Sequence, residues 1–262
     1  MELHLKDKSV IVLASSKGLG KATALEFAKE GAKVMLASRN LEELKTAANE
    51  IEKETGLKPN IQVCDVTKSE DIKNLVNKTI EIQGTIDVLV NNAGGPPAGG
   101  FDAFGDEEWQ YAFELNLLSF IRAIREVLPY MRKQGEGRIV NIASSSIKEP
   151  VDGLILSNTF RTGIVGLSKS LSKELASDQI LINTVGPGRI STGRIEELDH
   201  IRAEKLNITY EEGKNQFEKS IPMGRYGTPE EFAKTIVFLG SFANTYITGQ
   251  SLVVDGGLTK AF

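Results

Sequence analysis

The sequence is poor in the residues that build metal centres and disulfides. Its 262 residues include one cysteine, Cys64, and two histidines, His4 and His200, far apart along the chain. A single thiol cannot form an internal disulfide, and no Cys/His cluster has the spacing of metal ligands. We therefore expect a protein of a reducing compartment, the cytoplasm, with no bound metal and with Cys64 as a small buried hydrophobic residue.

Long apolar runs and an excess of one charge are also absent. No segment approaches the ~20 apolar residues of a membrane span, and the N-terminus lacks the apolar stretch of a signal peptide. The net charge is only −4, from 31 basic and 35 acidic residues, and no basic cluster stands out. Nucleic acid and membrane surfaces are therefore not expected partners.

What the sequence does contain is a regular alternation between short β-branched runs and longer segments of helical period. The expected strands are Ser9–Ala14, Lys33–Ser38, Asn60–Cys64, Ile86–Asn91, Gly137–Ser144, Ile180–Val185 and Ser251–Val254. The expected helices are Gly18–Glu30, Leu41–Glu54, Lys68–Gln83, Trp109–Gln134, Thr162–Ala176 and Pro229–Leu239. This alternation predicts an α/β fold, a doubly wound parallel sheet of about seven strands. With no linker or repeat, residues 1–262 are expected to form one domain.

Two segments interrupt this alternation. Gly94–Gly105 is rich in glycine and proline, and residues 192–227 are polar and only weakly helical in pattern. Both follow the carboxyl ends of expected strands, where ligands bind in open α/β sheets. The alternative is a plain surface loop, but long loops in a compact domain are more often functional. We expect the second segment to be a substrate lid.

A glycine-containing turn follows the first expected strand. Residues Ala14 to Gly20 read Ala-Ser-Ser-Lys-Gly-Leu-Gly and lead directly into a helix. Glycines at such a turn let backbone N–H groups approach a pyrophosphate, which the helix N-terminus also favours. An ordinary tight turn is the alternative. The position between a strand and an amphipathic helix favours a dinucleotide site.

From about Leu5 to Leu258 the chain resembles the short-chain dehydrogenase/reductase family, especially its β-ketoacyl-carrier-protein-reductase-like members. The shared pieces are Gly18 and Gly20 of the turn, Asp65-Val66, Asn91-Asn92-Ala93-Gly94, Pro187-Gly188-Arg189-Ile190-Ser191-Thr192, Gly224–Glu231, Ile247–Gln250 and Val254–Gly257. The turn departs from the family at Leu13 and Ala14, where threonine and glycine are usual.

The resemblance implies a Rossmann-type domain that forms a homo-oligomer, a dimer or tetramer, through the long helices at 109–134 and 162–176 and the last strand. It also implies a set of coenzyme-binding residues. These are Ser15, Ser16, Lys17, Gly18, Leu19, Gly20, Ser38, Arg39, Asp65, Val66, Asn92, Ala93, Gly94, Arg161, Pro187, Gly188, Ile190 and Thr192.

Charge at the end of the second strand indicates which dinucleotide is bound. Rossmann proteins that choose NAD place an acid there to bind the ribose 2′-hydroxyl. Here Ser38 holds that position and Arg39 follows it, while Lys17 lies in the glycine turn. Two cations without a carboxylate favour NADP(H), because arginine can hold a phosphate through two parallel hydrogen bonds. Solvated surface charges are the alternative.

The family's catalytic set of serine, tyrosine, lysine and asparagine is only half matched. Ser144 closes the fifth strand as the family's serine does, and Asn116 matches the helix asparagine. Counting back from Gly166–Leu171 places Ser157 and Arg161 where the family has Tyr-x-x-x-Lys. A serine hydroxyl is a far poorer acid than a phenol, and arginine does not release a proton.

Three hypotheses follow. The first is an NADP(H)-dependent oxidoreductase that acts on a small-molecule carbonyl or alcohol, most simply by reducing a 3-oxoacyl-type or other small or medium ketone or aldehyde. Ser144 and Ser157 would hold the substrate oxygen, and water or another group would supply the proton. Candidates for that group are Lys148, Glu149, Asp152 and Tyr210. The second is a non-catalytic NADP(H)-binding sensor or assembly partner. The third is another reaction on the same scaffold, such as elimination or epimerisation.

Overall fold

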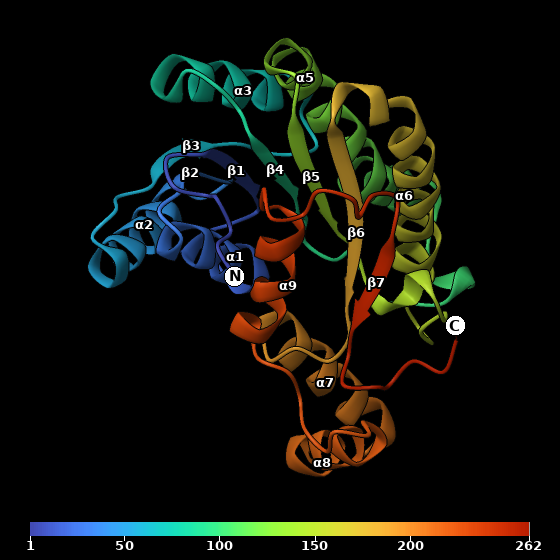
Figure 1. Ribbon diagram of the computed structural model, residues 1–262. Coiled ribbons are helices and arrows are strands. Elements are labelled where there is room, and N and C mark those ends of the chain that lie inside the picture. Colours follow the sequence, from blue (N-terminus) through green and yellow to red (C-terminus); the bar gives the residue numbers. More distant parts are fainter. Residues whose placement is uncertain (262) are drawn as a thin grey trace.

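The computed structural model describes residues 1–261, and its centre is one sheet of seven parallel strands (Figure 1). The strands lie in the order β3-β2-β1-β4-β5-β6-β7. Their bounds are β1 (Ser9–Leu13), β2 (Lys33–Ser38), β3 (Asn60–Val63), β4 (Val88–Asn91), β5 (Gly137–Ile142), β6 (Ile180–Pro187) and β7 (Ser251–Val254). The predicted fold class is confirmed, and every predicted strand is present within two residues of its expected bounds.

Helices cover both faces of the sheet and give it two separate apolar cores. The helices are α1 (Gly18–Lys29), α2 (Leu41–Thr55), α3 (Ser69–Gln83), α4 (Asp106–Phe113), α5 (Ser119–Gln134), α6 (Ile155–Glu174), α7 (Gly193–Leu206), α8 (Tyr210–Ser220) and α9 (Pro229–Leu239), with 3-10 turns η1 (Phe101–Ala103), η3 (Ser145–Ile147) and η4 (Ala176–Asp178) and a π-helical turn η2 (Glu114–Leu118). One core joins the sheet to α1, α2 and α9, and the other joins it to α3, α5 and α6. Because both faces are covered, β1 is apolar and buried along nearly its whole length.

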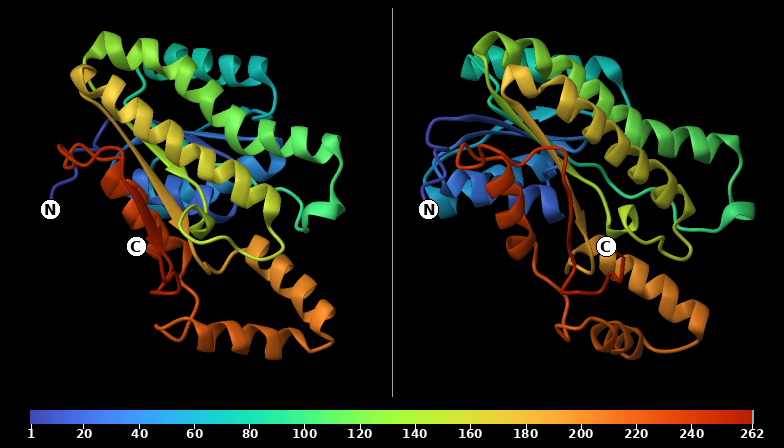
Figure 2. Two further views of the ribbon diagram at one scale, coloured as in Figure 1. Left: turned by 90° about the vertical axis from the view of Figure 1, so that its right-hand side faces the viewer. Right: turned by 45° about the vertical axis from the view of Figure 1, so that its right-hand side comes forward.

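The strand order fixes where a ligand can bind. β1 pairs with β2 on one side and with β4 on the other, so the direction of winding reverses between β1 and β4. In open α/β sheets, ligands bind beyond the carboxyl ends of the strands at this reversal. Helices α7 and α8 lie past the same edge, beyond the end of β6, and α4–α5 runs beside α6 on one face (Figures 1 and 2).

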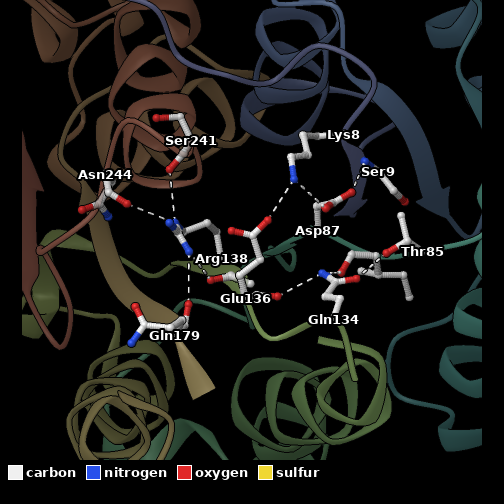
Figure 3. A network of polar contacts seen from close by, with 12 residues as sticks. Lys8, Ser9, Thr85, Asp87, Gln134, Glu136, Arg138, Gln179, Ser241 and Asn244 are labelled. Atoms are coloured by element: carbon white, nitrogen blue, oxygen red, sulfur yellow. Dashed lines mark hydrogen bonds and ion pairs between the residues drawn. The ribbon is translucent and has the colours of Figure 1, made fainter. Parts of the chain in front are cut away.

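The opposite edge, at the amino ends of the strands, is closed by polar contacts (Figure 3). Lys8 lies 3.2 Å from Asp87 and 3.1 Å from Glu136, and the other Asp87 oxygen accepts a bond from the Ser9 amide at 2.8 Å. The Arg138 guanidinium donates to main-chain carbonyls, including those of Ser241 and Asn244. Its donors are therefore used to tie β5 to the C-terminal part of the chain.

Two predicted helices differ from those observed. The single helix predicted over Trp109–Gln134 is three elements, because a π-helical turn at Glu114–Leu118 separates α4 from α5. The helix predicted to begin at Thr162 begins at Ile155. Its first turn contains Ser157 and Asn158, residue types that favour turns in isolation, so the sequence pattern hid it.

The structure also shows the burial of the cysteine, the character of the helices and the placement of residue types that bind metals. Cys64 is buried, as predicted, and burial raises the pKa of its thiol to about 12. None of the helices in residues 1–261 combines the length and apolarity that a membrane span requires. In the same range, no three His, Cys, Asp or Glu side chains are grouped so that they could hold a metal ion.

Candidate functional site

The glycine turn between β1 and α1 is tightly packed against the end of β4. A Cβ atom on Gly20 would lie 2.3 Å from the Ala14 carbonyl oxygen and 2.8 Å from the Asn92 side-chain nitrogen, so only glycine fits. Gly18 has a φ of 58°, a conformation that favours glycine. Lys17 precedes α1 without capping it through its side chain, which leaves the first N–H groups of α1 without a side-chain partner there.

Ala14 is one of the two residues at which the turn departs from the family pattern, and it stands where glycine is usual. Its φ of 47° places an alanine in the left-handed region, at an expected cost of about 1 kcal/mol. The carbonyl of Ala14 accepts a hydrogen bond from Asn92 at 3.2 Å. The chain thus keeps the conformation that glycine would adopt there and fixes it by a bond to the end of β4.

The serines of the turn have different partners. Ser15 is fully buried, and its hydroxyl donates to the Val12 carbonyl at 2.7 Å and accepts from the Ala37 amide at 3.0 Å. It therefore joins β1 to β2. The Ser16 hydroxyl lies 3.0 Å from that of Ser38 and is partly buried, at the end of β2.

A carboxylate that sequence reasoning missed lies beside these serines. Glu43, on the first turn of α2, accepts a hydrogen bond from Ser16 at 2.9 Å and lies 3.6 Å from the Lys17 ammonium. The end of β2 itself carries no acid, as the sequence indicates, but α2 adds the Glu43 carboxylate to this corner. Glu43 follows Ser38 by five positions, and only the return of α2 toward the glycine turn brings it to this corner.

The segment from Pro187 to Thr192 lies against the same turn. A Cβ atom on Gly188 would lie 2.4 Å from the Cβ of Asp255, so this backbone must pass close to the residue after β7. Thr192 caps α7 by accepting a bond from the Ile195 amide, and its methyl group lies 3.9 Å from the Cβ position of Gly18. The structure thus brings together two predicted coenzyme-binding segments from opposite halves of the chain.

The predicted pair Asp65–Val66 follows the end of β3. The amide of Cys64 donates to the Ser38 carbonyl at 2.9 Å, which keeps this strand end beside that of β2. Asp65 accepts bonds from the amide and the hydroxyl of Thr67, at 3.0 and 2.8 Å. These contacts fix the loop next to Ser38, on the outer side of the glycine turn.

Residues 192–227 contain two regular helices, α7 and α8, where the sequence pattern indicated little structure. A buried carboxylate joins them to the Pro187–Thr192 segment. Asp199 pairs with Arg189 and accepts a bond from the Tyr226 hydroxyl at 2.8 Å. The guanidinium carbons of Arg189 and Arg202 each lie over the Phe217 ring of α8, at 3.5 and 4.0 Å from its centroid.

Replacing this carboxylate should loosen the segment. In Asp199→Ala, the Arg189 guanidinium and the Tyr226 hydroxyl lose their shared buried partner, and we expect the free energy of unfolding to fall by about 2–4 kcal/mol. Denaturant unfolding followed by circular dichroism measures this. Glu196→Gln, at an exposed position of the same helix, serves as the control. If the free energy of unfolding falls no more in Asp199→Ala than in Glu196→Gln, Asp199 does not hold this segment in place through Arg189 and Tyr226.

The predicted serines lie where β5 ends and α6 begins. Ser144 follows β5, and its hydroxyl accepts a bond from the Ser146 amide at 3.2 Å, which forms the turn η3. Ser157 lies in the first turn of α6 and is only 7% exposed. Helix α6 packs against η3, so the structure brings the two serines into one region.

Arg161 lies one helical turn after Ser157 and is buried. Its Nη1 donates to the carbonyls of Ile142 and Ala143 at 3.1 and 2.8 Å, and its Nη2 donates to those of Ala93 and Gly94 at 3.2 and 3.5 Å. Burial, together with the nearby Arg194, lowers the pKa of the Arg161 guanidinium to about 10. The group therefore joins the carboxyl ends of β4 and β5.

Asn116 lies in the π-helical turn and shares a partner with Arg161. Its amide nitrogen donates to the Gly94 carbonyl at 2.9 Å, and its fully buried Oδ1 has no partner among the described residues. A π-helical turn inside a helix is rare and often marks a functional site. A buried amide oxygen without a partner is a position for a bound water or substrate group.

The structure also places two of the candidate proton donors. Glu149 accepts a bond from the Lys260 amide at 3.0 Å, which ties it to the C-terminal tail. The Tyr210 ring stacks on His200 at 4.3 Å, between α7 and α8. These contacts give neither side chain a bond to Ser144 or Ser157.

Known proteins resemble this chain in sequence and in overall fold. Residues 13–259 match the family described as enoyl-(acyl-carrier-protein) reductase. The chain is 37% identical to the 3-oxoacyl-acyl-carrier-protein reductase FabG of Chlamydia muridarum, over 98% of this chain and 100% of that protein. It is similar to L-sorbose reductase of Gluconobacter frateurii in complex with NADPH and L-sorbose, with a TM-score of 0.94, 30% identity and full coverage of both chains. Its TM-score with a variant of actinorhodin polyketide ketoreductase bound to NADPH is 0.93, at 33% identity and 97% coverage of each chain.

Proposed function

Since this chain belongs to the short-chain dehydrogenase/reductase family, we propose that it is an NADP(H)-dependent oxidoreductase that reduces a carbonyl with serine and arginine in place of the usual tyrosine and lysine. The substrate class is a 3-oxoacyl-type or other small or medium ketone or aldehyde. We further propose that it acts in the cytoplasm as a homo-oligomer, a dimer or a tetramer.

One observation carries the proposal. Ser144, Ser157 and Arg161 lie together at the carboxyl ends of β4 and β5, beside the winding reversal and the glycine turn. A protein that only bound a dinucleotide would need the turn, but it would not need the partly buried Ser144 and the buried Ser157 at this second position. The NADPH complexes of L-sorbose reductase and of the polyketide ketoreductase support the choice of coenzyme.

The residues of the chain fit this coenzyme. Gly20 is required by the packing of the turn itself, which holds the start of α1 where a pyrophosphate would bind, and Lys17 and Arg39 would bind the 2′-phosphate. Thr192 and the Pro187–Gly188 backbone would hold the nicotinamide end. When bound, NADPH supplies a hydride for the reduction of a carbonyl carbon.

The remaining steps belong to the side chains. The hydroxyls of Ser144 and Ser157 donate hydrogen bonds to the substrate oxygen, where negative charge develops as the carbonyl is reduced. Arg161 holds the ends of β4 and β5 in register and contributes a fixed positive charge. The unpartnered Oδ1 of Asn116 would accept a hydrogen bond from a water that relays a proton from bulk solvent to the substrate oxygen, so the relay water is restored after each turnover.

Removing the serine at the end of β5 tests this arrangement. Ser144→Ala loses a donor to the developing oxyanion, and we expect kcat/KM for a carbonyl substrate to fall by about 10²-fold. NADPH oxidation against a panel of ketones and aldehydes is the assay. Ser170→Ala, at an exposed position of α6, is the matched control and should leave the rate unchanged. Equal rates in the two variants would remove Ser144 from the mechanism.

Glu43 provides a separate test of the coenzyme. Its carboxylate beside Ser16 and Lys17 repels a 2′-phosphate, so Glu43→Gln should lower the Kd for NADPH by about threefold to tenfold, or roughly 1 kcal/mol. The Kd for NADH should not fall. Fluorescence titration measures both constants, with Glu52→Gln near the far end of α2 as the control. Weaker binding of NADPH in Glu43→Gln would show that the 2′-phosphate does not lie at this corner.

The second candidate function, a coenzyme-binding protein without catalysis, is favoured by one observation. The Arg161 guanidinium directs four hydrogen bonds to main-chain carbonyls, a structural use of a position that the family gives to chemistry. NADPH binding without turnover on any carbonyl of the panel would support this function. Turnover lost in Ser144→Ala would exclude it.

A further inference from the structure

Arg194, in the first turn of α7, reaches across to the glycine-rich loop after β4. Its Nη2 donates to the Pro96 carbonyl at 2.7 Å. A Cβ atom on Gly95 would lie 2.9 Å from the Arg194 Nε, so the guanidinium lies directly against that backbone and a larger residue there would displace it. The side chain is one-third exposed, so the group stays accessible from solvent.

The loop that Arg194 contacts is joined to the start of α6, the helix that carries Ser157. The amide of Gly99 in this loop donates to the Gly153 carbonyl at 2.6 Å, and Gly99 also forms a bridge with Leu154. Leu154 precedes Ser157 by three residues. Arg194 thus contacts a loop that is hydrogen-bonded to the chain just before the first turn of α6, where Ser157 lies.

Two positively charged side chains, Arg161 and Arg194, lie near each other beside the loop after β4. Arg194 is close enough to Arg161 to lower the pKa of that guanidinium. Arg161 has its Nη1 and Nη2 groups bonded to main-chain carbonyls, whereas Arg194 has one carbonyl and one exposed carboxylate, Glu197, at 2.9 Å. Like charges in proximity favour an anion between or beside them. Glu197, three residues later on the same helix and exposed, accepts a hydrogen bond from Arg194 Nη1, so this donor is accessible to a carboxylate.

The phosphates of the coenzyme have other partners. The glycine turn, Lys17 and Arg39 lie at the end of β1 and β2, whereas Arg194 contacts Gly95 and Pro96 beyond the end of β4. An anion held by Arg194 would therefore lie on the side of Ser157 and not beside the 2′-phosphate corner.

We propose that Arg194 binds the carboxylate of an oxo-acid substrate, whose ketone oxygen is then directed to Ser144 and Ser157. This inference rests on the proposed function and names its substrate class. A carboxylate can replace Glu197 on the guanidinium through two parallel charge-assisted bonds. Arg194 is thus a specificity-determining residue that neutral ketones do not use.

Three variants test the assignment, together with the unmodified protein. Arg194→Gln should raise KM for oxo acids about tenfold to a hundredfold, as expected for one charged hydrogen-bonding partner, and leave KM for neutral ketones within about twofold. Glu197→Gln removes the competing carboxylate and should lower KM for oxo acids by about twofold to fivefold. Arg132→Gln, a surface arginine paired with Asp178, makes the same change in net charge and should alter neither constant.

A binding measurement accompanies the kinetics. A 2-hydroxy or 3-hydroxy acid titrated calorimetrically onto the complex with NADP⁺ should bind the unmodified protein and bind Arg194→Gln at least tenfold more weakly. If the Kd for NADPH alone rises in Arg194→Gln while the preference between acids and neutral ketones stays, the anion is a coenzyme phosphate and the proposal is wrong. If the unmodified protein reduces neutral ketones with the same kcat/KM as oxo acids, Arg194 does not select for the carboxylate and this proposal fails. The proposed reductase function would still stand. Absence of turnover on every carbonyl overturns both.

Discussion

The double variant Ser157→Tyr/Arg161→Lys should reduce a carbonyl substrate about 10²- to 10³-fold faster than the unmodified protein, measured as kcat. This substitution restores the pair that the resemblance implies at these positions. A phenol, with a pKa near 10, releases a proton to a developing alkoxide far more readily than an aliphatic hydroxyl does, and positioned acid catalysis is worth about 10²–10⁴-fold. A lysine four residues later, on the same face of α6, favours the ionised phenol.

The matched control is Ser157→Phe/Arg161→Lys, which adds the same ring without the hydroxyl. It should be no faster than the unmodified protein, so the gain can be assigned to the acidic proton and not to packing. A pH profile gives a second readout, because the tyrosine variant should gain a dependence that the phenylalanine variant lacks. If both variants have the same kcat, Ser157 does not occupy the position of the proton donor.

Arg161→Met should destabilise the fold by about 3–5 kcal/mol. The substitution removes four hydrogen bonds from a charged donor to carbonyls at the ends of β4 and β5, each worth about 1.5–3 kcal/mol. It also removes a buried charge, which burial disfavours, as the lowered pKa of this guanidinium indicates. The lost bonds outweigh the relieved cost, so the net effect is a loss of stability.

Unfolding in urea measures the free energy, and two variants separate the contributions. Arg161→Lys keeps the charge but has fewer donors with less favourable directions. Its free energy of unfolding should therefore fall by less, about 1–3 kcal/mol. Ser157→Ala, one helical turn away, should cost less than about 1 kcal/mol. An Arg161→Met variant as stable as the unmodified protein would mean that these carbonyls are satisfied in another way.

The sheet could be predicted from the sequence because each strand is buried on both faces. Strands such as β1 are uniformly apolar, and the intervening segments have helical period, so local pattern and final fold agree. The glycine turn was also predictable, since Gly20 is required by contacts with Ala14, six residues earlier, within the same turn.

Helical structure in residues 192–227 was not predictable from apolar periodicity. Helix α8 is mostly polar and begins with a capping box formed by Thr209 and Glu212, so its start is fixed by capping. The break at Asn116 was also hidden, because the π-helical turn lies within an amphipathic pattern that continues on both sides.

The feature that the sequence predicted least well was which residues come together at the site. Glu43 reaches the glycine turn only because α2 folds back along β2, and Arg194 approaches Arg161 across 33 positions of sequence through the contact of α7 with the loop after β4. The four carbonyl partners of Arg161 come from two strand ends that are distant in sequence. Such contacts depend on tertiary packing, which residue pattern alone does not describe.

The transfer of deuterium from coenzyme to product tests the central claim most directly. NADPH deuterated at the nicotinamide C4 position is incubated with the protein and with the carbonyl compound that it turns over fastest, and the product is analysed by NMR and mass spectrometry. The account predicts deuterium on the carbinol carbon, in proportion to the coenzyme consumed and greatly reduced in Ser144→Ala. Tight binding of NADPH with no deuterium in any product would contradict it.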